Sequence, residues 1–208
     1  MIDIDQTKAI HMTIRSKLSA TLRLASVAAV SLALFGCATV KMPVPVTASA
    51  DNLSTLRAAN LAPAKAGAFV LAAGKPAAMD KTLDGLRGSS VEPQNGSFAQ
   101  TLREELVVEL KAAGLYDEAS KAVITGELTD SMVDAAIGTG TGRLGAHFTV
   151  ARDGKPVYDK TLVVDAKWDS SFVGAIALPA AINQYTALYK TLAGKLFADA
   201  DFQKALGR

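Results

Sequence analysis

The chain has 208 residues, which is room for one domain of ordinary size together with a leader and a linker. It carries 22 Lys and Arg against 20 Asp and Glu, and four of the basic and two of the acidic residues precede Cys37. The part from Cys37 onward is therefore formally neutral. Because no basic field is left to attract a phosphate backbone, nucleic acid is not expected as a partner.

Residues 24–35 form an uncharged, mainly apolar run behind a flank of three basic residues. Spanning a bilayer as a helix takes roughly 18 or more apolar residues, whereas the apolar part of a secretory signal takes about 7–15. The run therefore predicts a signal peptide over residues 1–36. Two acidic residues stand before the basic flank, where they do not help export, so Met12 is an alternative start.

The end of this run, Leu34-Phe35-Gly36-Cys37, resembles the lipobox of bacterial lipoproteins, although Phe35 stands where a small residue is usual. The resemblance implies that Cys37 receives diacylglycerol, that cleavage follows Gly36, and that the new amino group is acylated, commonly with palmitate. Ala38 in place of aspartate implies the periplasmic face of the outer membrane. The alternative is an ordinary leader that happens to contain the chain's only cysteine.

Residues 38–50 contain two prolines and no periodicity, which predicts an extended tether, and residues 51–59 predict a short helix with Asp51 as its N-cap. We therefore assign residues 37–64 to the lipidated cysteine, tether and short helix. Residues 65–208 are expected to form the domain.

A buried strand is predicted over residues 66–72 and a short edge strand over residues 86–92. Ser97-Phe98-Ala99-Gln100 matches a capping box, and apolar side chains then recur every four residues as far as Gly114. This pattern predicts a helix that covers a sheet.

A strand over residues 123–133 is followed by a glycine-rich loop and by two strands, 144–151 and 157–168, that flank Arg152-Asp153-Gly154-Lys155. Asp-Gly between two such runs predicts a hairpin, and both a two-residue and a three-residue turn fit it. Pro179 suits the first turn of a final long helix. The order predicts a single α+β domain with a largely antiparallel sheet and two long helices packed on one face.

No motif for catalysis or cofactor binding stands in the right context. Gly140–Gly145 fits the dinucleotide string, but a strand follows where a helix is needed, so a flexible loop is expected. His147 is the only histidine after the leader, and the acid pair Glu104-Glu105 suits a solvated helix face. We expect no cofactor, no metal site and no enzyme activity.

The segment Trp168–Ala181 is apolar yet lies between a strand and a helix. Phe172, Val173, Ile176 and Leu178 are candidate partner contacts if they are exposed. They are plug residues at the end of the sheet if they are buried. We expect burial, and we expect Trp168 to be buried at the strand end.

Three motifs, Ser97-Phe98-Ala99, the hairpin at Arg152–Lys155 and the run Trp168–Ala177, resemble a group of uncharacterised proteobacterial lipoproteins over about residues 53–206. The resemblance implies no functional residue. The order of elements also resembles the periplasmic βαβββα modules of peptidoglycan-synthase activators and of TolB-type N-terminal domains, at the level of fold alone.

The sequence therefore predicts a non-enzymatic outer-membrane lipoprotein that is held by acyl chains on Cys37 and binds an unknown envelope protein or other envelope component. An accessory role in envelope transport or lipopolysaccharide assembly is one alternative, and an envelope hydrolase is another. A cleft of converging acids with one raised pKa would favour the hydrolase. An exposed apolar ridge over residues 172–178 would favour binding.

Overall fold

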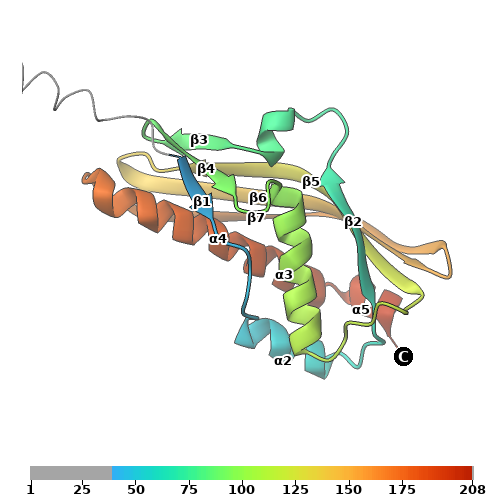
Figure 1. The fold of residues 1–208 in the computed structure, drawn as a ribbon. Helices are drawn as coiled ribbons and strands as arrows, with labels where there is room; N and C mark the ends of the chain where they lie inside the picture. The colour runs from blue at the N-terminus through green and yellow to red at the C-terminus, as the bar shows by residue number, and fades with distance from the viewer. Residues whose placement is uncertain (1–38, 208) are drawn as a thin grey trace, which may run out of the picture. The chain divides into compact units, whose positions relative to one another are not determined.

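Two sheets and two long helices make up the fold (Figure 1), and the computed structural model describes residues 39–207. The larger sheet has the strand order β2-β5-β6-β7, with β2 parallel to β5 and the other pairs antiparallel, and the smaller sheet has the order β1-β4-β3. The strands are β1 Thr39–Met42, β2 Lys65–Leu71, β3 Leu83–Leu86, β4 Ser89–Pro93, β5 Ala122–Asp134, β6 Gly138–Arg152 and β7 Lys155–Ser170. The helices are α2 Ala50–Ala58, α3 Phe98–Ala112, α4 Gly174–Ala198 and α5 Ala200–Leu206, with a short 3-10 turn η1 at Ala77–Asp80. The predicted α+β class is confirmed.

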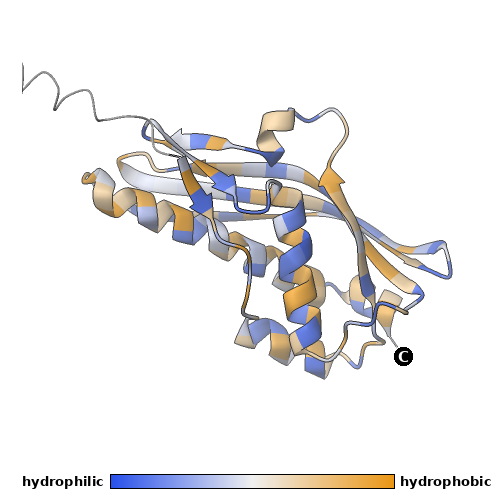
Figure 2. Cartoon of the chain, in the orientation of Figure 1, coloured by the Kyte–Doolittle hydropathy of each residue, from blue (hydrophilic) through white to orange (hydrophobic). Residues whose placement is uncertain are grey.

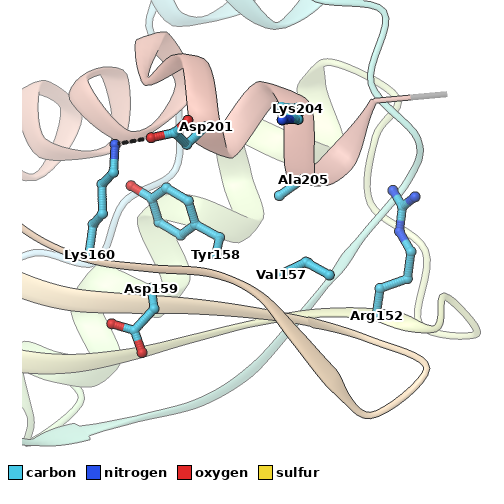
Figure 3. Close-up of a pocket in the computed structure, with 8 residues that line it drawn as sticks. All are labelled: Arg152, Val157, Tyr158, Asp159, Lys160, Asp201, Lys204 and Ala205. Carbon is cyan, nitrogen blue, oxygen red and sulfur yellow. Dashed lines mark ion pairs between the residues drawn. The ribbon is translucent and has the colours of Figure 1, made fainter.

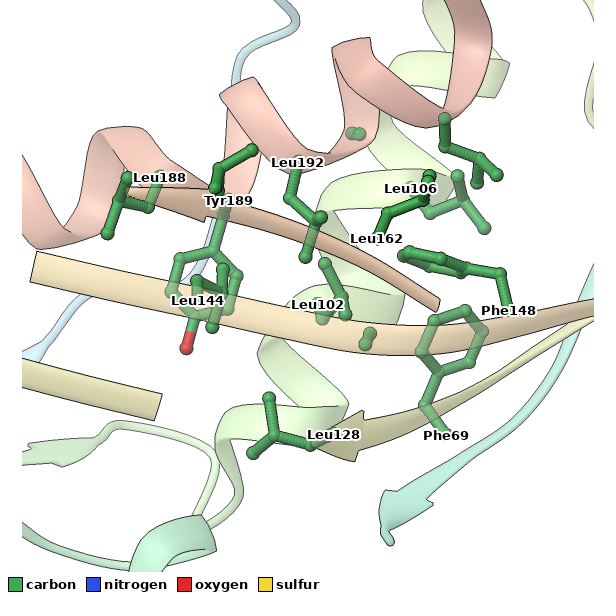
Figure 4. Packing of buried hydrophobic residues seen from close by; sticks show 14 of the residues in the cluster. Phe69, Leu102, Leu106, Leu128, Leu144, Phe148, Leu162, Leu188, Tyr189 and Leu192 are labelled. Atoms are coloured by element: carbon green, nitrogen blue, oxygen red, sulfur yellow. The ribbon is translucent and has the colours of Figure 1, made fainter. Parts of the chain in front are cut away.

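The core lies between the four-stranded sheet and the two long helices, α3 and α4 (Figure 4). Phe69 and Phe148 meet edge to face at 6.3 Å between ring centroids, and Leu106 of α3 is fully buried. Tyr185 of α4 is also fully buried, and its hydroxyl is hydrogen bonded to Ser131 Oγ at 2.7 Å. The Tyr185 hydroxyl is thus paired, as the burial of a polar atom favours. None of the helices within residues 39–207 combines the length and apolar character that crossing a membrane requires.

The N-terminus of α3 uses only half of the predicted capping box. Ser97 Oγ accepts a hydrogen bond from the Gln100 backbone N–H at 3.1 Å. The Gln100 side chain does not reach back; it donates to the Phe69 carbonyl at 2.6 Å and so satisfies one acceptor on β2. Asp80 instead takes up the free Ala99 N–H at 2.8 Å. The helix was predicted at the right place, with one cap partner supplied from elsewhere in the chain.

The tether prediction was wrong for the residues that form β1. Thr39–Met42 pairs in parallel with Ser90–Pro93 of β4, so the chain joins the smaller sheet two residues after Cys37. The short helix α2 was predicted, but its N-cap is Ser49 rather than Asp51. The predicted signal peptide, the alternative start at Met12 and Cys37 itself lie outside the described residues.

The hairpin between β6 and β7 has a two-residue turn. Arg152 pairs with Lys155, and both Asp153 (φ 52°) and Gly154 (φ 78°) have positive φ, as a type I′ turn demands. This settles the register that the sequence left open. A bulge follows one pair later, between Val150 and Ala151.

The glycine-rich string Gly140–Gly145, expected as a flexible loop, lies inside β6. A Cβ atom on Gly140 would come within 2.2 Å of the Trp168 indole, and one on Gly142 within 3.1 Å of Leu188. These glycines therefore make room for close packing against the sheet rather than for chain flexibility.

Candidate functional site

Four large apolar side chains are exposed together at one end of the four-stranded sheet. Phe172 is 79% exposed, Ile137 63%, Ile176 61% and Val173 50%. We call these four residues the apolar tip. In Figure 2 the first turns of α4, which carry Ile176, are among the hydrophobic parts of that end of the fold. A cluster of this kind marks a contact surface more often than a single exposed apolar side chain does.

The residues of the apolar tip come from two segments that sheet pairing brings together. Gly138 is the first residue of β6 and pairs with Ser170, the last residue of β7. Ile137 therefore ends the loop beside the segment that carries Phe172. Val173 is the N-cap of α4, and Ile176 lies one turn along that helix, with its N–H donating to the Val173 carbonyl at 3.0 Å.

Arg87, in the turn between β3 and β4, fastens both segments. Its Nε donates to the Ala135 carbonyl at 2.6 Å, in the loop before Ile137. Its two terminal nitrogens donate to the carbonyls of Phe172 (3.0 Å) and Ser171 (2.7 Å) and to Ser170 Oγ (3.0 Å). One guanidinium thus holds the backbone of the apolar tip while leaving its side chains exposed.

Helix α4 begins earlier than the sequence indicated. Pro179, expected in the first turn, is the sixth residue of a helix that starts at Gly174. Proline has no N–H to donate to the Ala175 carbonyl, so the opening turns of α4 lack one helical hydrogen bond. These turns carry Ile176 to the surface.

The prediction that this segment is a buried plug was wrong. Phe172, Val173 and Ile176 are exposed, and Leu178 alone of the four candidates is half-buried and packs against the core. Trp168, expected to be buried, is half-buried over Gly140. Ile137 was missed, because no sequence pattern indicates that the start of β6 beside it pairs with the end of β7.

We expect Arg87→Ala to lower the free energy of unfolding by about 2 kcal/mol, because several carbonyl oxygens lose a charged donor. Amide hydrogen exchange should accelerate at residues 171–174. Arg57→Ala, at an exposed position on α2, is the control and should leave both unchanged. Unchanged exchange at residues 171–174 in Arg87→Ala would show that the segment is held by other contacts.

A buried pair of acids lies where α2, α3 and α4 meet. Glu105 and Glu109 of α3 are 2% and 0% exposed. Glu109 Oε1 accepts from the Ser49 backbone N–H (2.9 Å) and from Asn52 Nδ2 (2.8 Å), and Asn52 also donates to the Lys190 carbonyl (3.0 Å). Burial, together with the charge on Glu109, raises the pKa of Glu105 to about 8. The expectation that Glu105 is a solvated charge was wrong.

In this acid pair Glu105 has the raised pKa that a hydrolase site needs, but the pair lacks the access to solvent that such a site also needs. A raised pKa suits a general acid at neutral pH. However, both side chains are closed off from solvent. Neither lines the cavity between the β6–β7 hairpin and α5, or the one between α2 and the end of α3. A substrate would have no access to them in this conformation.

A cavity of about 470 Å³ lies between the β6–β7 hairpin and α5 (Figure 3). Lys160 there is bound by Asp199 (3.0 Å) and Asp201 (2.6 Å), and these carboxylates raise its pKa. Burial raises the pKa of Tyr158 to about 12, so this phenol stays protonated at neutral pH. The cavity thus contains a protonated phenol and a cation that is already paired. The two ion pairs of Lys160 hold α5 against β7.

The lone histidine of the domain lies on the outer face of the sheet. His147 Nε2 is 3.3 Å from Asp159 Oδ1, and its Nδ1 is 3.1 Å from Thr161 Oγ1. Within residues 39–207, no three side chains of the His, Cys, Asp or Glu type come together in a way that could hold a metal ion.

The chain is similar in fold to a solved structure, the XCC0632 protein of Xanthomonas campestris, assigned to the family DUF330. The identity is 14% and the TM-score 0.50, over 76% of this chain and 94% of that one. A minor lipoprotein from Acinetobacter baumannii matches at 15% identity and a TM-score of 0.41, over 67% of this chain and 92% of that one. No model of a protein family and no curated protein matches the chain. At these identities the likeness concerns the fold.

Proposed function

We propose that the chain is a lipoprotein of the bacterial envelope, anchored by acyl chains on Cys37 at the periplasmic face of the outer membrane, and that it acts by binding rather than by catalysis. The anchor rests on the apolar run and Leu34–Cys37. Two or three acyl chains hold a protein stably on a membrane, whereas one chain binds only reversibly.

The apolar tip is the observation that supports a binding function. Its four side chains are exposed together, on a backbone that Arg87 holds in place. Apolar side chains that are exposed to water have a higher free energy than buried ones. A contact that covers the apolar tip is therefore favoured. The hydrolase alternative required acids in an open cleft, whereas Glu105, whose pKa is raised, and its neighbour Glu109 are both buried.

Replacing Cys37 with alanine tests the anchor. The variant should leave the detergent phase on phase separation, and its N-terminal peptide should carry no acyl mass, because the acceptor thiol is gone. Ala38→Ser keeps the thiol and should partition like the unchanged protein. Partitioning of Cys37→Ala with the detergent, without acyl mass, would contradict the proposal.

Ala38→Asp tests the assignment to the outer membrane. Under the sorting rule that the lipobox resemblance implies, aspartate after the acylated cysteine should retain the protein in the inner membrane. Separation of the two membranes by density would show the change. An unchanged distribution would mean that residue 38 does not direct sorting in this protein.

A further inference from the structure

The apolar tip lies at the same end of the domain as the start of β1 (Figure 1). Thr39, the first residue of β1, pairs with Ser90 of β4, and their hydroxyl oxygens are 3.2 Å apart. Ser90 follows Arg87 by three residues, so their Cα atoms are at most about 11 Å apart. Arg87 in turn donates to the Phe172 carbonyl at 3.0 Å. The β3–β4 turn, which carries Arg87, thus lies close to both strand β1 and the apolar tip.

Cys37 is two residues before Thr39 in the sequence. Two trans peptide units separate their Cα atoms by at most about 7.6 Å, whatever path the chain takes. Because β1 belongs to the sheet, no long tether stands between the proposed acyl chains and the domain. The bilayer that holds those chains therefore lies next to this end.

The exposed side chains at this end change from apolar at the tip to charged behind it. Asp169 pairs with Thr139, one register step behind Gly138 and Ser170, and Asp134 pairs with Thr141, two steps further back. Both aspartates are exposed. Lys167 is exposed and pairs with Thr141 as well, so the rim behind the apolar tip carries charges of both signs. An apolar tip with a charged rim suits shallow contact with a lipid interface, where charged groups stay among the headgroups and only the tip reaches the acyl chains.

We propose that the apolar tip inserts into the lipid interface beside the anchor, so that the domain is docked on its own membrane at a fixed orientation. The occupant is the phospholipid surface that holds the acyl chains on Cys37, and the proposal rests on the lipoprotein function given above. The β6–β7 hairpin then points away from the membrane, because Arg152, which pairs with Lys155, and Gly138 stand at opposite ends of β6. At 15 residues, β6 separates these ends by roughly 45 Å.

Site-specific fluorescent labels on the full acylated chain test the docking. Cys37 is the only native cysteine, and acylation removes its thiol, so one introduced cysteine can be labelled alone. Ile176→Cys places bimane at the apolar tip, and Lys155→Cys places it at the exposed hairpin as the matched control. The protein is reconstituted in vesicles of phosphatidylethanolamine and phosphatidylglycerol, part of which carry bromine on their acyl chains.

We expect brominated lipid to quench the Ile176→Cys label at least about twofold more than the Lys155→Cys label, because interfacial groups lie about 5–10 Å into the boundary. Phe172→Ser in the same protein should reduce that quenching. Phe172 is exposed, so this change does not remove a core side chain. Equal quenching at both positions, or none at either in a protein that floats with the vesicles, would overturn the docking.

Failure of the anchor gives a different result. A protein without acyl mass that does not float with vesicles contradicts the lipoprotein function, and the docking with it. If the acylated protein floats, if its Ile176→Cys label is not quenched, and if a photocrosslinker at Phe172 captures a protein in cells, the tip binds a protein. The anchor would then stand while the lipid contact would be wrong.

Discussion

Replacing Leu106 with aspartate is expected to abolish the cooperative thermal unfolding of the domain. Leu106 is 1% exposed and faces the sheet between α3 and the strands (Figure 4). A carboxylate at that position has no partner to compensate its lost hydration, and the apolar contacts of leucine are lost as well. The combined loss should exceed about 4 kcal/mol, which is a large part of the stability of an ordinary domain. Circular dichroism during heating measures it.

Ala112→Asp is the control for this change. It places the same charge on the same helix at an exposed position, so its cost should stay within about 1 kcal/mol. A Leu106→Asp variant that melts like the unchanged protein would mean that this face of α3 is not part of the core.

Helix α3 could be predicted because the signals that define it are local. The Ser97 cap, the spacing of Phe98, Leu102 and Leu106, and the stop at Gly114 all lie within one stretch of sequence. Its exact hydrogen bonds could not be predicted, because Asp80 and the Phe69 carbonyl come from distant segments. Local patterns place a helix, and tertiary contacts complete its caps.

Strand β1 and the first part of β6 were missed for a different reason. Four residues, Thr39–Met42, carry no periodicity that distinguishes a strand from a tether, and their partner β4 is some 50 residues away. Gly140 looks like a loop residue until the Trp168 indole is placed over it. The role of these residues depends on a neighbour that sequence spacing alone does not identify.

Hydropathy was misleading in two opposite cases. Phe172 and Ile176 were expected inside because they are apolar, and they are exposed; Glu105 was expected outside because it is charged, and it is buried. Both departures cost stability, and such departures concentrate at sites with a role beyond folding. The apolar tip is the departure for which we propose an external contact.

Glu105 should make the stability of the domain fall as the pH rises between about 4.5 and 8. Its pKa is about 8 in the folded protein, against an ordinary value of 4.5, first because the group is buried and second because Glu109 is charged. Lys190 acts in the opposite direction. Between these two pKa values the folded state holds a proton that the unfolded chain releases, so unfolding becomes more favourable as protons are removed.

The expected slope for one such proton is about 1.4 kcal/mol for each pH unit, and the loss from this group ends above a pH of about 8, where both states are ionised. Glu105→Gln keeps the shape of the protonated side chain and cannot ionise. The variant should therefore match the unchanged protein near pH 5 and be more stable by a few kcal/mol near pH 9. The difference between the two proteins removes the contribution of every other titrating group.

Denaturant unfolding at a series of pH values measures this difference. Glu127→Gln makes the same chemical change at an exposed position on β5 and should run parallel to the unchanged protein at every pH. The region that loosens first should be the junction of α2 with α3, because Glu109 holds Ser49 and Asn52 beside the ionising group. If Glu105→Gln also runs parallel to the unchanged protein, Glu105 is ionised in the folded state, and water or a rearranged side chain must compensate its charge.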